Sequence, residues 1–107
     1  SLIMAQDDSQ LQKMIAEESA LLLTFSSPTC VPCKQMEPRL DNLSSEPLST
    51  TFIKADVTLC PRTATQFMVR SVPTMLLIKS GKVLRQWVGL IREDIIRQDV
   101  VAMKNRS

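Results

Sequence analysis

The sequence predicts an α/β fold in which a central mixed β-sheet of four to five strands is flanked by helices on both faces. In the first half of the chain, helical and strand patterns alternate, and this order requires parallel strands joined by a right-handed crossover. In the second half, two strand patterns flank Ser80 and Gly81, residue types typical of a tight turn between antiparallel strands. The length of 107 residues suits a single domain, residues 1–107, and no repeat or linker interrupts it.

The first predicted elements are arranged around one buried strand. Asp7, Asp8 and Ser9 offer side chains that can cap a helix over about residues 8–18, where apolar residues recur at helical spacing. The almost wholly apolar segment 21–25 predicts a strand that is buried on both faces. A helix from about residue 30 or 31 to residue 43 follows, and Pro38 inside it is expected to bend it.

Five further elements complete the predicted fold. They are a strand at 50–57, a short helix at 61–68, two strands at 75–79 and 83–88, and a last helix at 92–103. The residues expected on the buried face of the last helix are Ile95, Ile96, Val100 and Met103. The methionines expected on inner faces are Met36, Met68, Met75 and Met103.

Composition excludes several classes of function. The net charge of +2 is small, and the basic residues are scattered without stacking aromatics among them, so nucleic-acid binding is not expected. Two glycines are too few for a phosphate-binding loop. The sequence contains no histidine, which removes Ser/His and Cys/His catalytic pairs and makes a zinc site unusual. No apolar run approaches the roughly 20 residues of a membrane-spanning helix.

The strongest functional signal is Cys30-Val31-Pro32-Cys33, where the buried strand ends and a helix begins. Unpaired backbone N–H groups and the positive end of the helix dipole favour a thiolate on Cys30, which is therefore the expected nucleophile. Cys33 lies one turn further on and is the expected resolving cysteine. Two inert cysteines or half of a zinc site are the alternatives, but the strand–helix placement favours redox chemistry. The redox-active disulfide would need no cofactor and no metal.

Four segments, in order along the chain, resemble the thioredoxin family. The family's buried strand, redox motif and proline-containing helix are similar to residues 20–40, ALLLTFSSPTCVPCKQMEPRL. Its second signature is similar to residues 69–74, VRSVPT, and its closing hairpin and following glycine to residues 79–83 and 88–89. The resemblance covers nearly the whole chain. It implies a thioredoxin fold and a protein disulfide reductase that works through a mixed disulfide.

The resemblance also implies roles for individual positions. Pro73 would follow a cis peptide bond beside the cysteines, and the Val72 backbone would pair with an extended substrate segment. The contact surface would consist of Thr29, Val31, Pro32, Val72, Pro73 and Gly89. Expected partners are disulfide-containing proteins and a thioredoxin-reductase-like or other dithiol donor. A cytoplasmic monomer is expected, although an exported location stays open because the sequence begins with Ser1 rather than Met.

The sequence departs from the family at several positions. Thr29, Ser26 and Val31 stand where the family usually has tryptophan, another aromatic residue and glycine. Thr24 stands at the family's buried aspartate, and a threonine cannot act as a base. Lys54 matches a family lysine that normally pairs with that aspartate, so Lys54 is expected to lose its partner and to point to solvent. These departures bear on efficiency, substrate range and recognition by the usual reductase.

Two further residues are singled out. Cys60 is expected to be a partly exposed thiol in the loop before the short helix, either a second redox site or, by preference, a cysteine without function. Trp87 is expected to pack in the core or at the sheet edge rather than to replace the missing aromatic contact of the active site.

Three functions follow from the sequence. A protein disulfide reductase is favoured, because Pro32 before Cys33 resembles the family's reductants. An exported disulfide oxidase or isomerase is the second. A non-catalytic partner-binding module is the third, and the intact cysteine pair argues against it.

Overall fold

The fold is built on one five-stranded sheet with the strand order β1-β3-β2-β4-β5. The computed structural model describes residues 1–105. Strands β1, β3 and β2 are parallel, whereas β4 is antiparallel to β2 and β5 is antiparallel to β4. The predicted mixed sheet is therefore confirmed. The strands are β1 (Ile3–Ala5), β2 (Ala20–Ser26), β3 (Thr51–Asp56), β4 (Thr74–Lys79) and β5 (Lys82–Val88).

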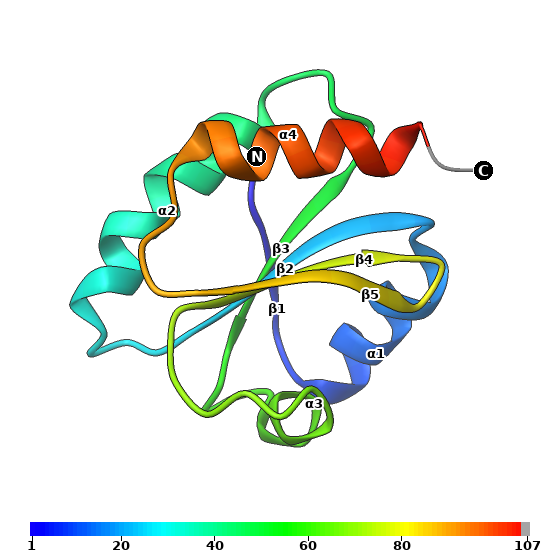
Figure 1. Ribbon diagram of the computed structural model, residues 1–107. Helices are drawn as coiled ribbons and strands as arrows, with labels where there is room; N and C mark the ends of the chain where they lie inside the picture. The colour runs from blue at the N-terminus through cyan, green and yellow to red at the C-terminus, as the bar shows by residue number, and fades with distance from the viewer. Residues whose placement is uncertain (106–107) are drawn as a thin grey trace.

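Two helices cover each face of the sheet (Figure 1). On one face lie α1 (Asp8–Glu17) and α3 (Pro61–Gln66), and on the other lie α2 (Val31–Ser44) and α4 (Glu93–Lys104). All four helices lie within two residues of the bounds predicted from the sequence. Within residues 1–105, no helix has both the length and the apolar character that a membrane span requires.

The central strand β2 contributes to the core on both faces of the sheet. Leu21, Leu23 and Phe25 belong to the cluster under α1 and α3, whereas Leu22 belongs to the cluster under α2 and α4. Successive residues of a strand point to opposite faces, so a strand covered on both sides must be apolar throughout. The loop that leads to Cys30 begins at the end of this buried strand.

Two details of the structure contradict or extend the sequence prediction. The sequence does not predict β1, since only Ala5 of its three residues is buried, while Ile3 and Met4 are 45% and 49% exposed. Ile95 was expected on the buried face of α4 but is 36% exposed. The buried stripe of that helix consists of Ile96, Val100 and Met103.

Trp87 is partly buried on edge strand β5 and packs against the cluster under α2 and α4, as expected.

Met68 also contradicts the prediction, because its side chain is 68% exposed rather than buried. Met68 follows α3 with a left-handed backbone, φ 57°. The N–H of Val69 donates to the carbonyl of Ala64 at 2.9 Å, so Met68 occupies the turn position of a Schellman-type helix end. This position favours glycine, because a Cβ atom is disfavoured in the left-handed region.

Replacing Met68 with glycine is expected to stabilise the protein by about 0.5–1 kcal/mol, because relief of the left-handed backbone outweighs the extra freedom of glycine in the unfolded chain. Urea unfolding curves measure this change. The control Met68→Ala keeps the Cβ atom and should leave stability nearly unchanged. A glycine variant no more stable than the alanine variant would show that the turn is not strained.

Candidate active site

Cys30 and Cys33 are joined by a disulfide at the point where β2 gives way to α2. Cys30 is the N-cap of α2 and has an extended backbone, with φ −92° and ψ 109°, while Cys33 lies in the first turn. Their Cα atoms are 5.2 Å apart. The strand–helix junction predicted from the sequence therefore brings the two sulfurs together.

The first turn of α2 directs backbone N–H groups at Cys30. The N–H of Cys33 donates to the Cys30 sulfur at 3.1 Å, and the N–H of Lys34 donates to the Cys30 carbonyl at 3.3 Å. Pro32 lies in this turn, where the N–H it lacks would have no intrahelical acceptor. In the reduced protein, the same N–H group and the helix dipole stabilise negative charge on the Cys30 sulfur.

Both cysteines are shielded from solvent, whereas their neighbours are not. Cys30 is 9% exposed and Cys33 is 6% exposed, so the expected resolving cysteine is the slightly more buried of the two. Thr29 and Val31 are exposed, Val31 to 64%, and Pro32 is half-buried. The solvent-accessible neighbours of the disulfide in the sequence are therefore Thr29, Val31 and Pro32.

The sheet brings Pro73 and Gly89 to the edge where β2 ends. Phe25 of β2 pairs with Thr74 of β4, so Pro73, immediately before Thr74, lies beside the last residues of β2. The Val72–Pro73 peptide bond is cis, the isomer that the resemblance implies. Gly89 donates its N–H to the Pro73 carbonyl at 2.9 Å and has φ 88°, a conformation that favours glycine.

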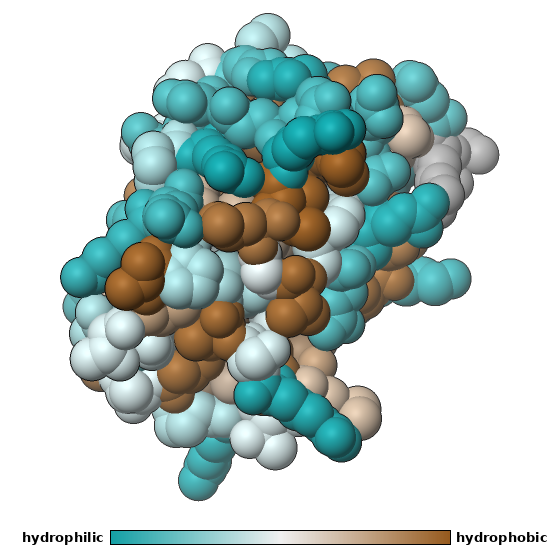
Figure 2. Space-filling model, turned by 60° about the vertical axis from the view of Figure 1, so that its left-hand side comes forward, coloured by the Kyte–Doolittle hydropathy of each residue, from teal (hydrophilic) through white to brown (hydrophobic). Residues whose placement is uncertain are grey.

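Apolar side chains stay exposed at this edge. Val31 is joined by Val88 and Leu90, which are 54% and 46% exposed on either side of Gly89. Figure 2 brings this side of the molecule forward and shows apolar residues grouped among polar ones. Sequence reasoning missed Val88 and Leu90. Their position next to Gly89 was the signal that could have found them.

Lys54 has no aspartate partner at Thr24, but it does not simply point to solvent, in contrast to the expectation from the sequence, because it pairs with another carboxylate. Its ammonium group donates to both carboxylate oxygens of Glu37 on α2, at 3.1 and 3.0 Å, and its side chain is 26% exposed. Glu37 was also missed by sequence reasoning. The signal was its position four residues after Cys33, because residues at that spacing share one face of a helix.

Cys60 contradicts the expectation of a partly exposed thiol, since it is completely buried in the cluster under α1 and α3. Burial, together with the negative charges of Asp8, Asp7 and Asp56, raises the pKa of Cys60 to about 11. A thiol held in its protonated form is a poor nucleophile. Cys60 is therefore chemically distinct from the Cys30–Cys33 pair.

Cys60 is expected to resist alkylation by iodoacetamide in the folded, reduced protein at about pH 8, because it is buried and protonated. Cys30 should be modified first, and Cys60 only after denaturation or as the pH approaches 11. Peptide mass spectrometry of samples alkylated with and without urea measures the difference. Modification of Cys60 at the same rate in both samples would contradict its burial.

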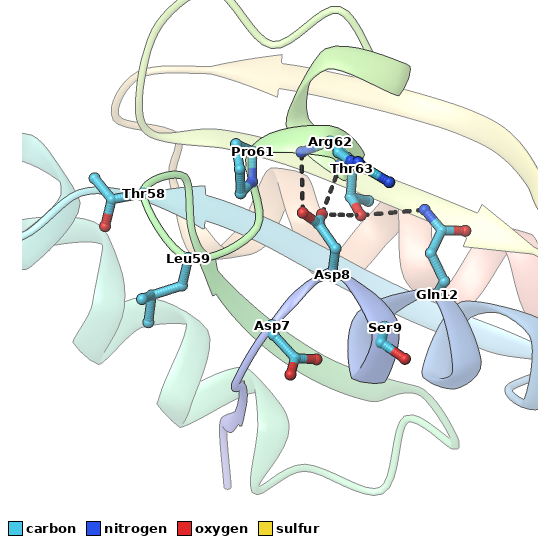
Figure 3. Close-up of a pocket in the computed structure, with 9 residues that line it drawn as sticks. All are labelled: Asp7, Asp8, Ser9, Gln12, Thr58, Leu59, Pro61, Arg62 and Thr63. Carbon is cyan, nitrogen blue, oxygen red and sulfur yellow. Dashed lines mark hydrogen bonds between the residues drawn. The ribbon is translucent and has the colours of Figure 1, made fainter.

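A separate hollow of about 710 Å³ lies between the starts of α1 and α3 (Figure 3). The Asp8 carboxylate accepts hydrogen bonds from the N–H groups of Arg62 and Thr63 at 3.1 and 2.8 Å, and from the Thr63 hydroxyl at 2.6 Å. Burial opposes ionisation, but these bonds outweigh it and lower the pKa of Asp8. Asp8 thus links α1 to α3, and neither Cys30 nor Cys33 lines the hollow.

Within residues 1–105, no group of three or more Cys, Asp or Glu side chains is placed to hold a metal ion.

The thioredoxin family model matches residues 2–102 of the chain. The chain is 39% identical over 74 residues to the thioredoxin of Chlamydia trachomatis serovar D, which covers 69% of this chain and 72% of that protein. It is 32% identical over 90 residues to thioredoxin C-2 of Corynebacterium nephridii, with 83% of each chain covered.

Solved structures show the same fold. A mutant thioredoxin from Halobacterium salinarum NRC-1 superposes with a TM-score of 0.90 at 24% identity, covering 100% of this chain and 94% of that one. The thioredoxin from Nicotiana alata superposes with a TM-score of 0.85 at 27% identity, covering 99% and 93%. The arrangement of sheet and helices around the cysteine pair is therefore shared with these proteins.

Proposed function

The chain belongs to the thioredoxin family, and from this premise we propose that Cys30 attacks and Cys33 resolves disulfides in partner proteins. Family membership and the close cysteine pair make the protein a thiol–disulfide oxidoreductase of the protein disulfide reductase kind. The observation that carries the proposed roles is the placement of Cys30 at the N-cap of α2, with Cys33 in the following turn. The N-cap position favours the thiolate on Cys30.

The exchange proceeds in two balanced steps. The Cys30 thiolate attacks one sulfur of the partner's disulfide, so that a bond from Cys30 to the partner forms while the partner's S–S bond breaks and releases one thiolate. The Cys33 thiolate then attacks the Cys30 sulfur, closes the internal disulfide and releases the second partner thiolate. The partner gains two electrons and two protons, and a dithiol donor returns the protein to its reduced form.

We propose that an extended segment of the partner lies along the backbone of Val72. Val72 lies just before β4, at the edge of the sheet next to the cysteine pair. The side chains proposed to contact the partner segment are Thr29, Val31, Pro32, Pro73 and the neighbours of Gly89. The exposed apolar surface of Val31, Val88 and Leu90 suits an apolar flanking residue in the partner.

We propose a cytoplasmic monomer that needs no metal, cofactor or nucleic acid and takes electrons from a thioredoxin-reductase-like or other dithiol donor. A free buried thiol, Cys60, suits a reducing compartment. The apolar surface beside the disulfide must remain open to substrates, which supports a monomer. The small net charge of +2 supports the absence of nucleic-acid binding.

The proposal is tested by reduction of insulin disulfides with dithiothreitol as the electron donor, followed by light scattering of the precipitating chain. We expect the protein to accelerate the reaction over dithiothreitol alone. The reduction potential of the pair should lie near the reference value of about −270 mV for thioredoxin itself. A potential of about −120 mV would favour the exported oxidant instead, and no acceleration would favour a binding module.

A further inference from the structure

One ion pair lies beneath the start of α2, on the face of the sheet that this helix covers. Paired residues of adjacent strands form a row across the sheet there: Met4, Lys54, Thr24, Met75 and Trp87. Thr24, in the middle of the row, is 4% exposed and carries no charge. The charge on this row therefore comes from Lys54, directly beside Thr24.

The partner of Lys54 shares a helix face with the resolving cysteine. Cys33 and Glu37 are four residues apart in α2, which places their Cβ atoms about 5–6 Å from each other. Both carboxylate oxygens of Glu37 accept hydrogen bonds from Lys54, at 3.0 and 3.1 Å. The ion pair thus joins α2 to β3 one turn from Cys33.

A second observation also places Lys54 near the cysteine pair. Lys54 lines a hollow of about 250 Å³ together with Ser26, Ser27 and Pro28, the residues that lead from β2 toward Cys30. Water in this hollow reaches the ammonium group, but the 6% exposure of Cys33 keeps water from screening the sulfur fully.

Few other charges face Cys33. On α2 the adjacent residue Lys34 is exposed, and on β3 Asp56 lies two residues beyond Lys54 on the same face of the strand. At this level β2 and β4 present only uncharged residues. The first turn of α4 carries Glu93 and Asp94, and Asp94 is held by Arg92 at 3.1 Å.

We propose that the Glu37–Lys54 ion pair sets how readily Cys33 gives up its proton in the resolving step. Glu37 and Lys54 are positioning residues in this role, because the reacting atoms are the sulfurs. The negative charge of Glu37 opposes a Cys33 thiolate, and the positive charge of Lys54 favours it. The two charges offset each other. Removing the charge of Glu37 should therefore make Cys33 more acidic, and removing the charge of Lys54 should make Cys33 less acidic. This inference rests on the proposed resolving role of Cys33.

The test titrates Cys33 alone, in a protein that carries Cys30→Ser and Cys60→Ala, by the ultraviolet absorbance of the thiolate. Glu37→Gln should lower the midpoint of the Cys33 titration, and Lys54→Gln should raise it, each by about threefold to tenfold in proton affinity. The double variant should return to within about twofold of the parent, because both charges are gone.

Three controls separate this role from a structural one. Glu46→Gln breaks a similar ion pair, Glu46–Arg97 at 2.7 Å, beyond the far end of α2, and should leave the Cys33 titration unchanged. Lys54→Arg keeps the positive charge and should preserve the parent midpoint. If Lys54→Gln does not fold, Glu37→Lys replaces it and should lower the midpoint more than Glu37→Gln does.

Two results would overturn the inference: unchanged midpoints in the Glu37 and Lys54 variants, or shifts of both in the same direction. Insulin reduction by the unmodified protein tests the proposed function separately. An active protein whose Cys33 titration ignores both substitutions would reject the ion-pair role and leave the reductase intact.

Discussion

Replacing Cys30 with serine is expected to lower the rate of insulin reduction by more than about a thousandfold. A serine hydroxyl at the N-cap of α2 is not ionised at neutral pH, so the first bond to the partner's sulfur does not form. The loss should appear at every pH at which the protein is folded, since the one other cysteine of the pair, Cys33, is only 6% exposed and Cys60 is buried.

Cys60→Ser is the matched control, because it removes the third cysteine, which is buried and takes no part in the disulfide. That variant should retain activity within about twofold of the unmodified protein once its fold is confirmed by circular dichroism. Activity of Cys30→Ser above a tenth of the unmodified value would show that Cys30 is not the attacking residue.

Replacing Phe25 with alanine is expected to destabilise the protein by about 3–5 kcal/mol, a large part of the stability of a domain of this size. Phe25 is completely buried near the end of β2, and its ring centroid is 6.4 Å from that of Phe67. The substitution leaves a cavity in the cluster under α1 and α3, one residue before the end of β2. Urea unfolding followed by circular dichroism measures the loss, and reductase activity should fall at temperatures where the variant unfolds.

Phe25→Leu is the matched control for this change. It keeps most of the buried volume and should destabilise the protein by only about 1–1.5 kcal/mol. Leu59→Ala, at a residue that is 47% exposed, should change stability by about 0.5 kcal/mol or less. Equal losses for Phe25→Ala and Leu59→Ala would contradict the assignment of β2 as the centre of the core.

The order and the bounds of most elements could be predicted because their signals are local. The apolar run of β2, the helical spacing of α1 and the turn at Ser80-Gly81 each depend on residues close together in the sequence. The redox pair could be predicted for the same reason, since Cys30 and Cys33 lie within one helical turn. The order of these elements was enough to predict that the pair lies at a strand–helix junction.

The features that could not be predicted depend on contacts between distant segments. β1 is defined by its pairing with β3 rather than by an apolar pattern. Cys60 is buried because α1 and α3 meet over it, and no local signal indicates that contact. Lys54 keeps a partner because Glu37, seventeen positions away, approaches it from α2. Met68 was predicted wrongly for a local reason, because the left-handed turn at the end of α3 leaves its apolar side chain exposed.

Trapping of the mixed disulfide tests the roles of the two cysteines most directly. Cys33→Ser removes the resolving sulfur, so a partner that has been attacked should remain covalently attached. Peptide mass spectrometry of this variant, incubated with a disulfide-containing protein under non-reducing conditions, should find the partner linked to Cys30. Attachment at Cys60, or no covalent adduct while the unmodified protein reduces the same partner, would contradict attack by Cys30 and resolution by Cys33.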